Sequence, residues 1–346
     1  MNDNEKKKVT IYDVAKEAGV SPGTVSRYIN GVGEPRGKTK NRIEQAIRNL
    51  NYVPNRAARA LKSKRKNLLC LAYPESDNPF FFELVDVVEQ EVKKAGYSLM
   101  IYHTHAEIEE ELRILSLTQE GVMDGLIMVN FNYTPAHFEA FSQVDCPLVI
   151  SSLCNSPYGG KESDNFDYVG INVKHGMYLS ALHMAAQGHK KIAYVGGPNE
   201  ICVFRERYEG YCRALTEKGL EINDTYCFLG EFDRRAGYKA GLQICEMKEK
   251  PTAVCAVSDV VAIGLLEAFK EKGLRMPEDI AISGMDNIDF DRAFTPELTS
   301  VKMRQREVGK CAMECLISRI NGDSSAAKKI IYEPELVIRR SSSIER

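Results

Sequence analysis

The sequence has no apolar segment long enough to cross a membrane. No run approaches the roughly 18 apolar residues that a span needs, and the N-terminus has no apolar signal-peptide core. It also has no G-x-x-x-x-G-K-[ST] or H-E-x-x-H motif, which argues against a P-loop nucleotide hydrolase and a zinc protease. We therefore expect a cytoplasmic protein with no membrane contact, no catalytic residues and no cofactor.

Disulfide and metal-ligand spacings are missing as well. The 10 cysteines are scattered among apolar runs without a C-x-x-C pair, which favours buried, reduced thiols. His103 and His105 alternate on one strand, but no cysteine or carboxylate at ligand spacing completes a metal site, so we expect structural or surface histidines. Several aspartates fall in predicted loops, where we expect them to cap elements or bind a ligand: Asp164, Asp167, Asp286, Asp289 and Asp291.

Positive charge is concentrated at the N-terminus. Residues 1–67 contain 16 Lys or Arg against 6 Asp or Glu, a net charge of +10, and the remainder contains 30 against 42, a net charge of −12. This asymmetry indicates a segment that binds a polyanion, carried by an acidic body. A solvated basic tail would explain residues 6–8, but not basic residues interleaved with helical apolar periodicity as far as Arg65.

Residues 10–27 predict two helices joined by a glycine turn, which is the helix-turn-helix pattern. Thr10 is the expected N-cap, and Asp13 three residues later completes a capping box. Gly19 ends the first helix where a left-handed conformation is needed, and Ser21 caps the second helix. The pattern is typical of proteins that read the major groove of DNA.

A second basic segment, residues 52–61 (YVPNRAARAL), lies directly before a linker at residues 63–67. A helix over residues 55–62 is too short to be stable alone in water. We therefore expect this helix to form only when DNA and a partner chain are present.

Beyond the linker, short apolar runs alternate with amphipathic helical stretches. The predicted strands are residues 68–73, 98–102, 125–129, 148–151, 191–195, 252–257 and 280–284. This alternation, which restarts near Tyr168, predicts an α/β body of two doubly wound parallel-sheet lobes with helices on both faces. Ligands of such sheets bind at the carboxyl ends of the strands, here between the two lobes.

The chain resembles the LacI-type bacterial transcriptional regulators (LacI/GalR family) almost from end to end. In the head, the resemblance lies in residues 12–15 (YDVA), 24–27 (TVSR) and 52–55 (YVPN). In the body, it lies in residues 78–81 (NPFF), 123–127 (MDGLI), 188–192 (GHKKI), 258–264 (SDVVAIG) and 277–280 (PEDI). The resemblance implies an all-α head, a periplasmic-binding-protein-like body with three crossovers, and three partners: double-stranded operator DNA, a small-molecule effector and a second copy of the chain.

The expected domains follow from this resemblance. Residues 1–62 form the DNA-binding domain with a hinge helix at about 55–62, residues 63–67 the linker, and residues 68–346 the effector-binding and dimerisation domain. Its first lobe comprises about 68–166 plus 291–322, and its second lobe about 167–290 plus 323–346. The chain lacks the C-terminal leucine-rich helix that some members use to form tetramers, which favours a homodimer.

The second head helix should enter the major groove. Thr24 is expected to contact a base or a thymine methyl group, and Arg27 is expected either to pair with guanine or to contact phosphate only. Phosphate contacts are expected from Tyr12, Ser21, Ser26 and Asn30.

The segment after residue 54 should add specificity, because Pro22 and Gly23 stand where the family often places base-reading side chains. The segment starts at Asn55, and Ala58 is small enough for close approach of two such helices in the minor groove. The resemblance implies that Leu61 inserts between base pairs and kinks the duplex. The alternative is an ordinary connecting helix in which Leu61 is a packing residue.

Seven candidate effector-binding residues also follow from the resemblance: Asn78, Phe80, Phe81, Arg207, Phe232, Ser258 and Asp286. The carboxylate of Asp286 is expected to accept two ligand hydroxyls. Phe80 and Phe81 each either stack on a sugar or base face or belong to the core. Val203 stands where relatives often have a hydroxyl or an amide.

Arg207 occupies the position of the family's ligand-binding arginine, and Arg205 is expected to be a solvated helix residue. Phe232 matches the usual aromatic wall, and Ser258 replaces a frequent asparagine.

We predict a sequence-specific repressor that leaves its operator when a sugar, a nucleoside or a similar small polar metabolite binds between the lobes. Two alternatives remain: a regulator for which the metabolite is a co-repressor, and a metabolite-binding module whose head docks a protein co-regulator. Salt-dependent binding to promoter DNA distinguishes the DNA-binding hypotheses from the last one.

Overall fold

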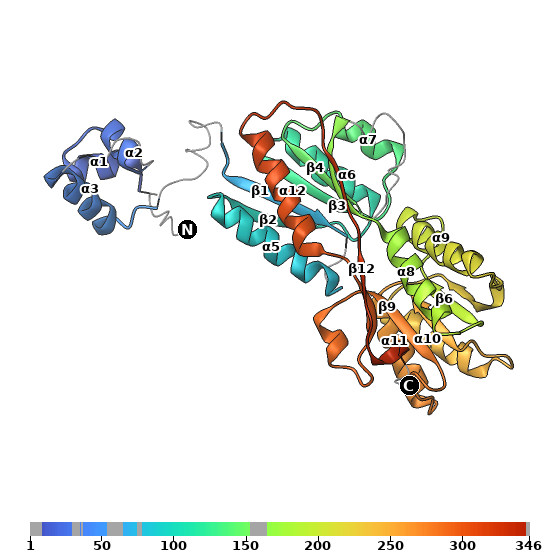
Figure 1. Ribbon diagram of the computed structural model, residues 1–346. Helices are drawn as coiled ribbons and strands as arrows, with labels where there is room; N and C mark the ends of the chain where they lie inside the picture. Colours follow the sequence, from blue (N-terminus) through green and yellow to red (C-terminus); the bar gives the residue numbers. More distant parts are fainter. Residues whose placement is uncertain are drawn as a thin grey trace, which may run out of the picture. The chain divides into compact units, whose positions relative to one another are not determined.

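The computed structural model describes residues 9–29, 35, 37–53, 65–74, 78–152 and 165–343. The chain divides into two compact units, Met1–Lys66 and Asn67–Arg346, called the head and the body below (Figure 1). The predicted hinge helix and four predicted DNA contacts lie outside the described residues: Asn30, Asn55, Ala58 and Leu61. In the described part of the chain, no helix is long and apolar enough to cross a membrane.

The head contains the helices α1 (Ile11–Ala18), α2 (Pro22–Ile29) and α3 (Lys38–Asn49). The Asp13 carboxylate accepts the backbone N–H of Thr10 at 2.8 Å, as the predicted capping box requires. Gly19 ends α1 at a φ of 61°, in the left-handed region. The three helices bury one small apolar core: Val14, Ala15, Ala18, Val25, Ile43 and Ala46. The predicted helix-turn-helix is confirmed.

The body is built on two six-stranded sheets. The first, in the order β11-β5-β4-β3-β1-β2, is parallel throughout and defines the first lobe. Its strands are β1 (Leu68–Tyr73), β2 (Ser98–His103), β3 (Gly125–Asn130), β4 (Leu148–Ser152), β5 (Asp167–Ile171) and β11 (Lys329–Tyr332).

The second sheet, in the order β12-β10-β9-β8-β6-β7, defines the second lobe and is parallel except for the pairing of β12 with β10. Its strands are β6 (Ile192–Gly196), β7 (Cys227–Leu229), β8 (Ala253–Ala256), β9 (Ala281–Asp286), β10 (Thr299–Lys302) and β12 (Glu335–Val337).

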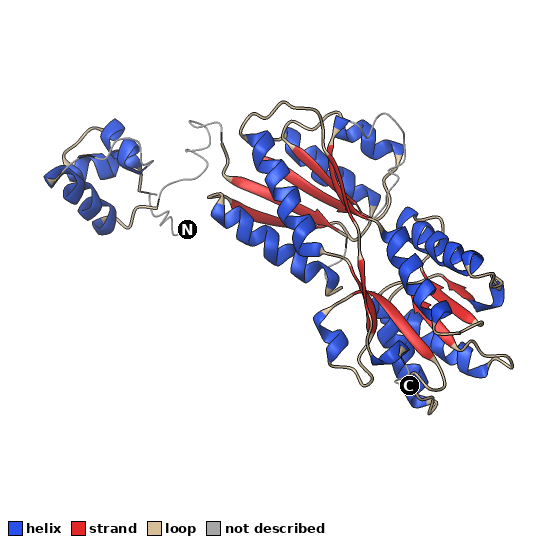
Figure 2. Ribbon diagram, viewed as in Figure 1, coloured by secondary structure: helices blue, strands red, loops and turns tan. Residues whose placement is uncertain are grey.

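Helices cover the sheets, as Figure 2 shows. In the first lobe, α5 (Phe80–Lys94) packs beside α12 (Gln305–Ile320), and α6 (Ile108–Gln119) packs beside α7 (Pro135–Phe141) over a separate apolar cluster. In the second lobe, the packed pairs are α8 (Val173–Ala186) with α9 (Cys202–Glu217), and α10 (Arg234–Glu246) with α11 (Asp259–Glu271). The described part of the body also contains three short 3₁₀ helices: η2 (Asp224–Tyr226), η3 (Asp289–Arg292) and η4 (Arg340–Ser342). The predicted α/β class with parallel sheets is confirmed.

The expected lobe boundaries were wrong in three places. The strand β5, expected to begin the second lobe, pairs with β4 of the first sheet, where Tyr168 lies opposite Ile150. The strand β10, expected in the first lobe, pairs with β9 of the second sheet. The strand β11, expected in the second lobe, pairs with β5. An apolar run shows that a strand is buried but not which sheet it joins, because the chain can stay in one lobe or cross to the other between two consecutive strands.

Candidate functional site

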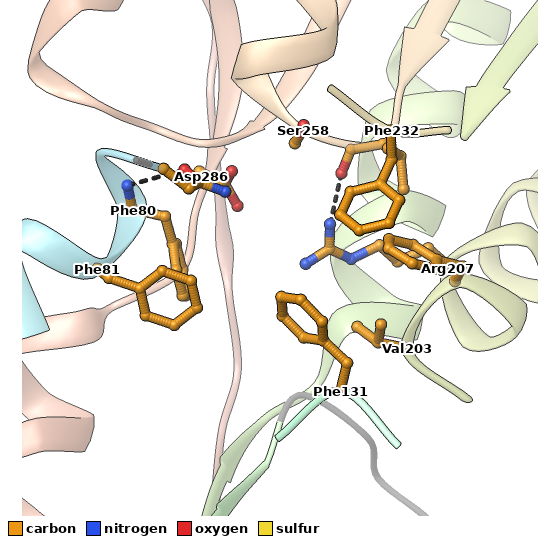
Figure 3. Close-up of a pocket in the computed structure, with 11 residues that line it drawn as sticks. Phe80, Phe81, Phe131, Val203, Arg207, Phe232, Ser258 and Asp286 are labelled. Atoms are coloured by element: carbon orange, nitrogen blue, oxygen red, sulfur yellow. Dashed lines mark hydrogen bonds between the residues drawn. The ribbon is translucent and has the colours of Figure 1, made fainter. Parts of the chain in front are cut away.

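A cavity lies between the two lobes, and eleven residues line it: Asn78, Phe80, Phe81, Phe131, Val203, Phe204, Arg207, Phe232, Val257, Ser258 and Asp286. Figure 3 shows their side chains converging on one space. All seven predicted effector-binding residues are among them. The cavity volume is about 20 Å³, which is room for about one water molecule.

The first lobe contributes the start of α5. The Oδ1 atom of Asn78 accepts the backbone N–H of Phe80 at 3.0 Å, so Asn78 closes the turn that begins the helix. Phe80 and Phe81 are both buried, with ring centroids 4.9 Å apart in an edge-to-face arrangement. Both rings therefore pack into the apolar core and also line the cavity.

The second lobe contributes the start of α9 and the loop before α10. The rings of Phe204 and Phe232 lie 4.4 Å apart between centroids. Phe131, which follows β3 of the first lobe, brings its ring to 6.1 Å from Phe204 and 6.3 Å from Phe232. Aromatic rings from both lobes thus line the cavity together.

Arg207 is the cation of the cavity. Its side chain points from α9 toward the space between the rings (Figure 3) and is only 5% exposed. The Nη1 atom donates to the carbonyl oxygen of Val257 at 2.6 Å, and the Nε atom has no acceptor. Among the described residues, no carboxylate lies within ion-pair distance of Arg207. A bound molecule with acceptor oxygens or nitrogens would therefore supply the bonds that this guanidinium lacks.

Asp286 ends β9 at the opposite wall. It is buried, with an unusual backbone φ of 127°, and Asn287 follows at a φ of 56°. Neighbouring side chains hold this bend: Gln305 donates to the carbonyl oxygen of Asp286 at 3.1 Å, and Ser300 accepts the Asn287 N–H at 3.0 Å. Arg339 donates to the Asn287 side chain at 2.6 Å. Strained backbone held by such a network is typical of binding sites.

Two further carboxyl groups lie next to this bend, and both are fully buried. Asp259 accepts the Ser300 hydroxyl at 2.6 Å and the Ile288 N–H at 3.1 Å. Asp291 lies 3.6 Å from the Arg339 guanidinium. Burial, and then the neighbouring Asp259 carboxylate, raise the pKa of Asp291 to about 10. Burial also raises the pKa of Asp259, so burial and the mutual repulsion of the two carboxyl groups oppose the ionisation of both beside the bend.

Ser258 has a structural task as well as a place in the cavity wall. Its hydroxyl oxygen accepts the Val261 N–H at 3.3 Å and so caps the start of α11. The hydroxyl proton remains available to a ligand acceptor.

Sequence reasoning missed Phe131, Phe204 and Val257, and it treated Val203 only as a substitution. Phe131 and Val257 directly follow β3 and β8, so the rule that ligands bind at strand carboxyl ends could have found both. Phe204 has no such signal.

The two histidines named above and Asp167 do not line this cavity, and Asp164 lies outside the described residues. The rings of His103 and His105 lie 3.9 Å apart, and the described ranges contain no cluster of three His, Cys, Asp or Glu side chains that could hold a metal. Asp167, which was expected in a loop, is instead the first residue of β5, and it accepts two hydrogen bonds from Arg319, at 2.7 and 2.8 Å.

The head presents its predicted DNA contacts on and around α2. Tyr12 is 70% exposed, Ser21 and Arg27 are exposed, and Thr24 and Ser26 are half-buried. The Ser21 hydroxyl accepts the Thr24 N–H at 3.1 Å, which caps α2. This cap lies in a G-x-S-x-G spacing, but the element directly before it is the helix α1 and not a strand, unlike the strand that precedes a hydrolase nucleophile.

Comparisons with known proteins agree with this arrangement. Residues 10–55 match the family described as bacterial regulatory proteins, lacI family, and residues 181–342 match the periplasmic binding protein-like domain. The chain is 33% identical to the HTH-type transcriptional repressor PurR of Photobacterium profundum, over 96% of this chain and 98% of that protein. It is 34% identical to PurR of Pasteurella multocida, over the same shares.

Solved structures with a similar fold span nearly the whole chain. The transcriptional regulator CelR in complex with cellobiose has a TM-score of 0.72 and 27% identity, covering 96% of this chain and 99% of that one. The Lac repressor bound to ONPG in the repressed state has a TM-score of 0.84 and 26% identity, covering 97% and 100%.

Proposed function

The chain belongs to the lacI family of bacterial regulatory proteins, and we propose that it is an operator-binding repressor, released when a small polar metabolite fills the cavity between its lobes. The observation that carries this proposal is the cavity itself, where a buried guanidinium and a buried carboxylate face each other across aromatic rings. A DNA-binding head joined to such a cavity has the parts of a ligand-responsive regulator.

The head supports the DNA-binding half of the proposal. Exposed Arg27 and half-buried Thr24 lie on α2, the helix that a helix-turn-helix places in the major groove. Exposed Tyr12 and Ser21 are suited to phosphate contacts, which set the position of the head on the duplex. Leu61 is proposed as the wedge in the minor groove.

The cavity supports a ligand of the sugar class or a similar polar metabolite. Phenyl rings offer apolar faces, Arg207 offers donors, Asp286 offers an acceptor, and Ser258 offers a hydroxyl. The related regulator CelR was solved with cellobiose. We propose that the ligand of this chain is bound by the same combination of flat apolar contacts and edge-on hydrogen bonds.

The small volume of the cavity favours the inducer sense of the response. At about 20 Å³ the cavity has no room for a sugar while the rings stand in these positions. Binding must therefore move rings of the two lobes apart, and a ligand changes an equilibrium only by favouring one arrangement. We propose that parting the lobes separates the two hinge segments of a homodimer and so releases the operator. The Lac repressor was solved as a dimer on its operator, and a cytoplasmic location follows from this role.

The test starts with selection of a DNA sequence from a random duplex library by the full-length protein. Fluorescence anisotropy then measures affinity for the selected duplex and a scrambled duplex at several salt concentrations. A thermal-shift screen of sugars, nucleosides and nucleobases identifies ligands that stabilise the protein. We expect salt-dependent, sequence-specific binding that weakens about tenfold or more with a screened ligand. Equal affinity for both duplexes would refute the repressor function, and a ligand that tightens binding would establish the co-repressor sense instead.

A further inference from the structure

The turn between β3 and α7 touches the opposite lobe directly. The Val203 N–H donates to the carbonyl oxygen of Phe131 at 3.3 Å, and the Cys202 N–H donates to Oδ1 of Asn132 at 3.4 Å. Both donors belong to the first turn of α9, whose N-cap residue Ile201 supplies no side-chain acceptor. The first N–H groups of any helix lack partners inside the helix. For α9, the first lobe supplies the acceptors for two of these N–H groups.

This turn is braced from its own lobe. Oδ1 of Asn130 accepts the Asn132 N–H at 2.9 Å, and Nδ1 of His137 accepts the Thr134 N–H at 3.1 Å. On its other side the His137 ring lies 2.8 Å from a carboxylate oxygen of Glu111, with both side chains buried. The brace holds Asn132 in place, so its contact with α9 depends on the position of the whole lobe.

The ring of Phe131 extends the same contact into the cavity. It packs against Phe204 and Phe232 of the second lobe and lies 6.3 Å from Phe81 of its own lobe. The Phe131 carbonyl oxygen accepts a hydrogen bond from the Val203 N–H, and Val203 lies next to Phe204 on α9. A ligand that separates Phe131 from the rings of the second lobe therefore acts directly on both hydrogen bonds to α9.

We propose that Phe131 and Asn132 form an interlobe latch, which caps α9 from the first lobe, holds the lobes closed without a ligand and opens when the effector enters. The capping follows from the contacts above. The opening by an effector rests on the proposed function of the cavity. On this view, Asn132 sets how easily the protein responds, although it does not line the cavity.

Hydrogen–deuterium exchange of the full-length protein, without ligand or DNA, tests the cap. Asn132→Ala removes the acceptor, and peptides covering residues 199–206 should exchange roughly fivefold faster, the factor that loss of a helix cap gives. Asn132→Asp keeps an acceptor and adds negative charge at a helix N-terminus, so it should retain the wild-type protection. Asn199→Ala is the matched control, because the Asn199 side-chain oxygen accepts no hydrogen bond within the described residues.

Operator affinity, measured by anisotropy with the duplex that the wild-type protein selects, tests the link to function. Without any small molecule, Asn132→Ala should bind that duplex several-fold more weakly, because an open latch imitates the effector. Unchanged exchange over residues 199–206 would overturn the latch. Faster exchange with unchanged affinity would overturn its role in release. If the wild-type protein selects no duplex, the repressor function fails, while the exchange result still decides the cap.

Discussion

Replacing Arg207 with methionine should stabilise the protein while abolishing its response to ligand. The guanidinium is buried at 5% exposure, and within the described residues its hydrogen bond goes to the Val257 carbonyl oxygen at 2.6 Å. Within the described residues no carboxylate neutralises it, so the ligand-free protein carries the desolvation cost of a buried cation. Methionine fills a similar volume with an unbranched, adaptable side chain and carries no charge.

The expected size follows from two opposing effects. Removing the cation relieves a desolvation cost of several kcal/mol. Losing the bond to Val257 costs about 1.5–3 kcal/mol, because the donor is charged. The difference leaves a net stabilisation of about 1–2 kcal/mol, which corresponds to a rise in Tm of roughly 2–4 °C for a unit of this size.

Differential scanning fluorimetry of the ligand-free proteins measures this change, and a second scan with a ligand from the screen measures the response. Arg205→Met is the matched control, because Arg205 lies on the same helix and is half-exposed, so its Tm should change little. A Tm of Arg207→Met lower than that of the wild type would refute the argument that the buried guanidinium lowers the stability of the protein and is kept to bind the ligand.

Further predictions concern the cavity, the head and pH. Asparagine tolerates the positive φ of residue 286. Asp286→Asn should lower the affinity for the screened ligand about 10–100-fold in thermal-shift titrations, because a charged acceptor is lost. Ligand-free operator affinity should stay within about threefold, and an unchanged ligand response would show that Asp286 is structural. Leu61→Ala should weaken binding to the selected duplex by about 1–3 kcal/mol, measured by anisotropy, and leave binding to a random duplex unchanged. Equal losses of affinity for both duplexes would exclude a wedge. Arg27→Ala should relax preference at one base pair per half-site, whereas uniform weakening across variants would identify a phosphate contact. Burial opposes the ionisation of Asp167, but the bonds from Arg319 and the Lys328 N–H outweigh it and lower its pKa. The stabilisation is therefore present above the unfolded pKa of about 4 and is lost as pH falls through the folded pKa. Urea titrations of wild type and Asp167→Asn should converge as the pH falls below about 4, and a constant difference would contradict this.

The head could be predicted almost residue by residue because its signals are local. A capping box spans three residues, a left-handed glycine ends one helix, and a serine begins the next. Each of these depends on hydrogen bonds within one turn of chain, so the order of residues is enough to specify them. Part of the cavity wall could be predicted for a related reason. Asn78, Ser258 and Asp286 each stand at or beyond the carboxyl end of a strand, and each of these strands is recognisable as an apolar run in the sequence.

The sequence does not show which sheet β5, β10 and β11 join. The strand β11 pairs with β5, which lies far away in the chain. The strands β5 and β10 each pair with the preceding strand, and this depends on where the chain crosses between the lobes. The same holds for the latch. Nothing near Asn132 indicates that its side chain caps a helix that begins 70 residues later, in the other lobe. Sequence by itself determined the helices of the head, the alternation of the body and most of the polar groups of the cavity. Only the tertiary structure decided which lobe each crossing strand completes, that no carboxylate within the described residues pairs with Arg207, and that Phe131 and Asn132 contact the other lobe. All three depend on how the chain passes between the lobes and not on residues that are neighbours in the sequence.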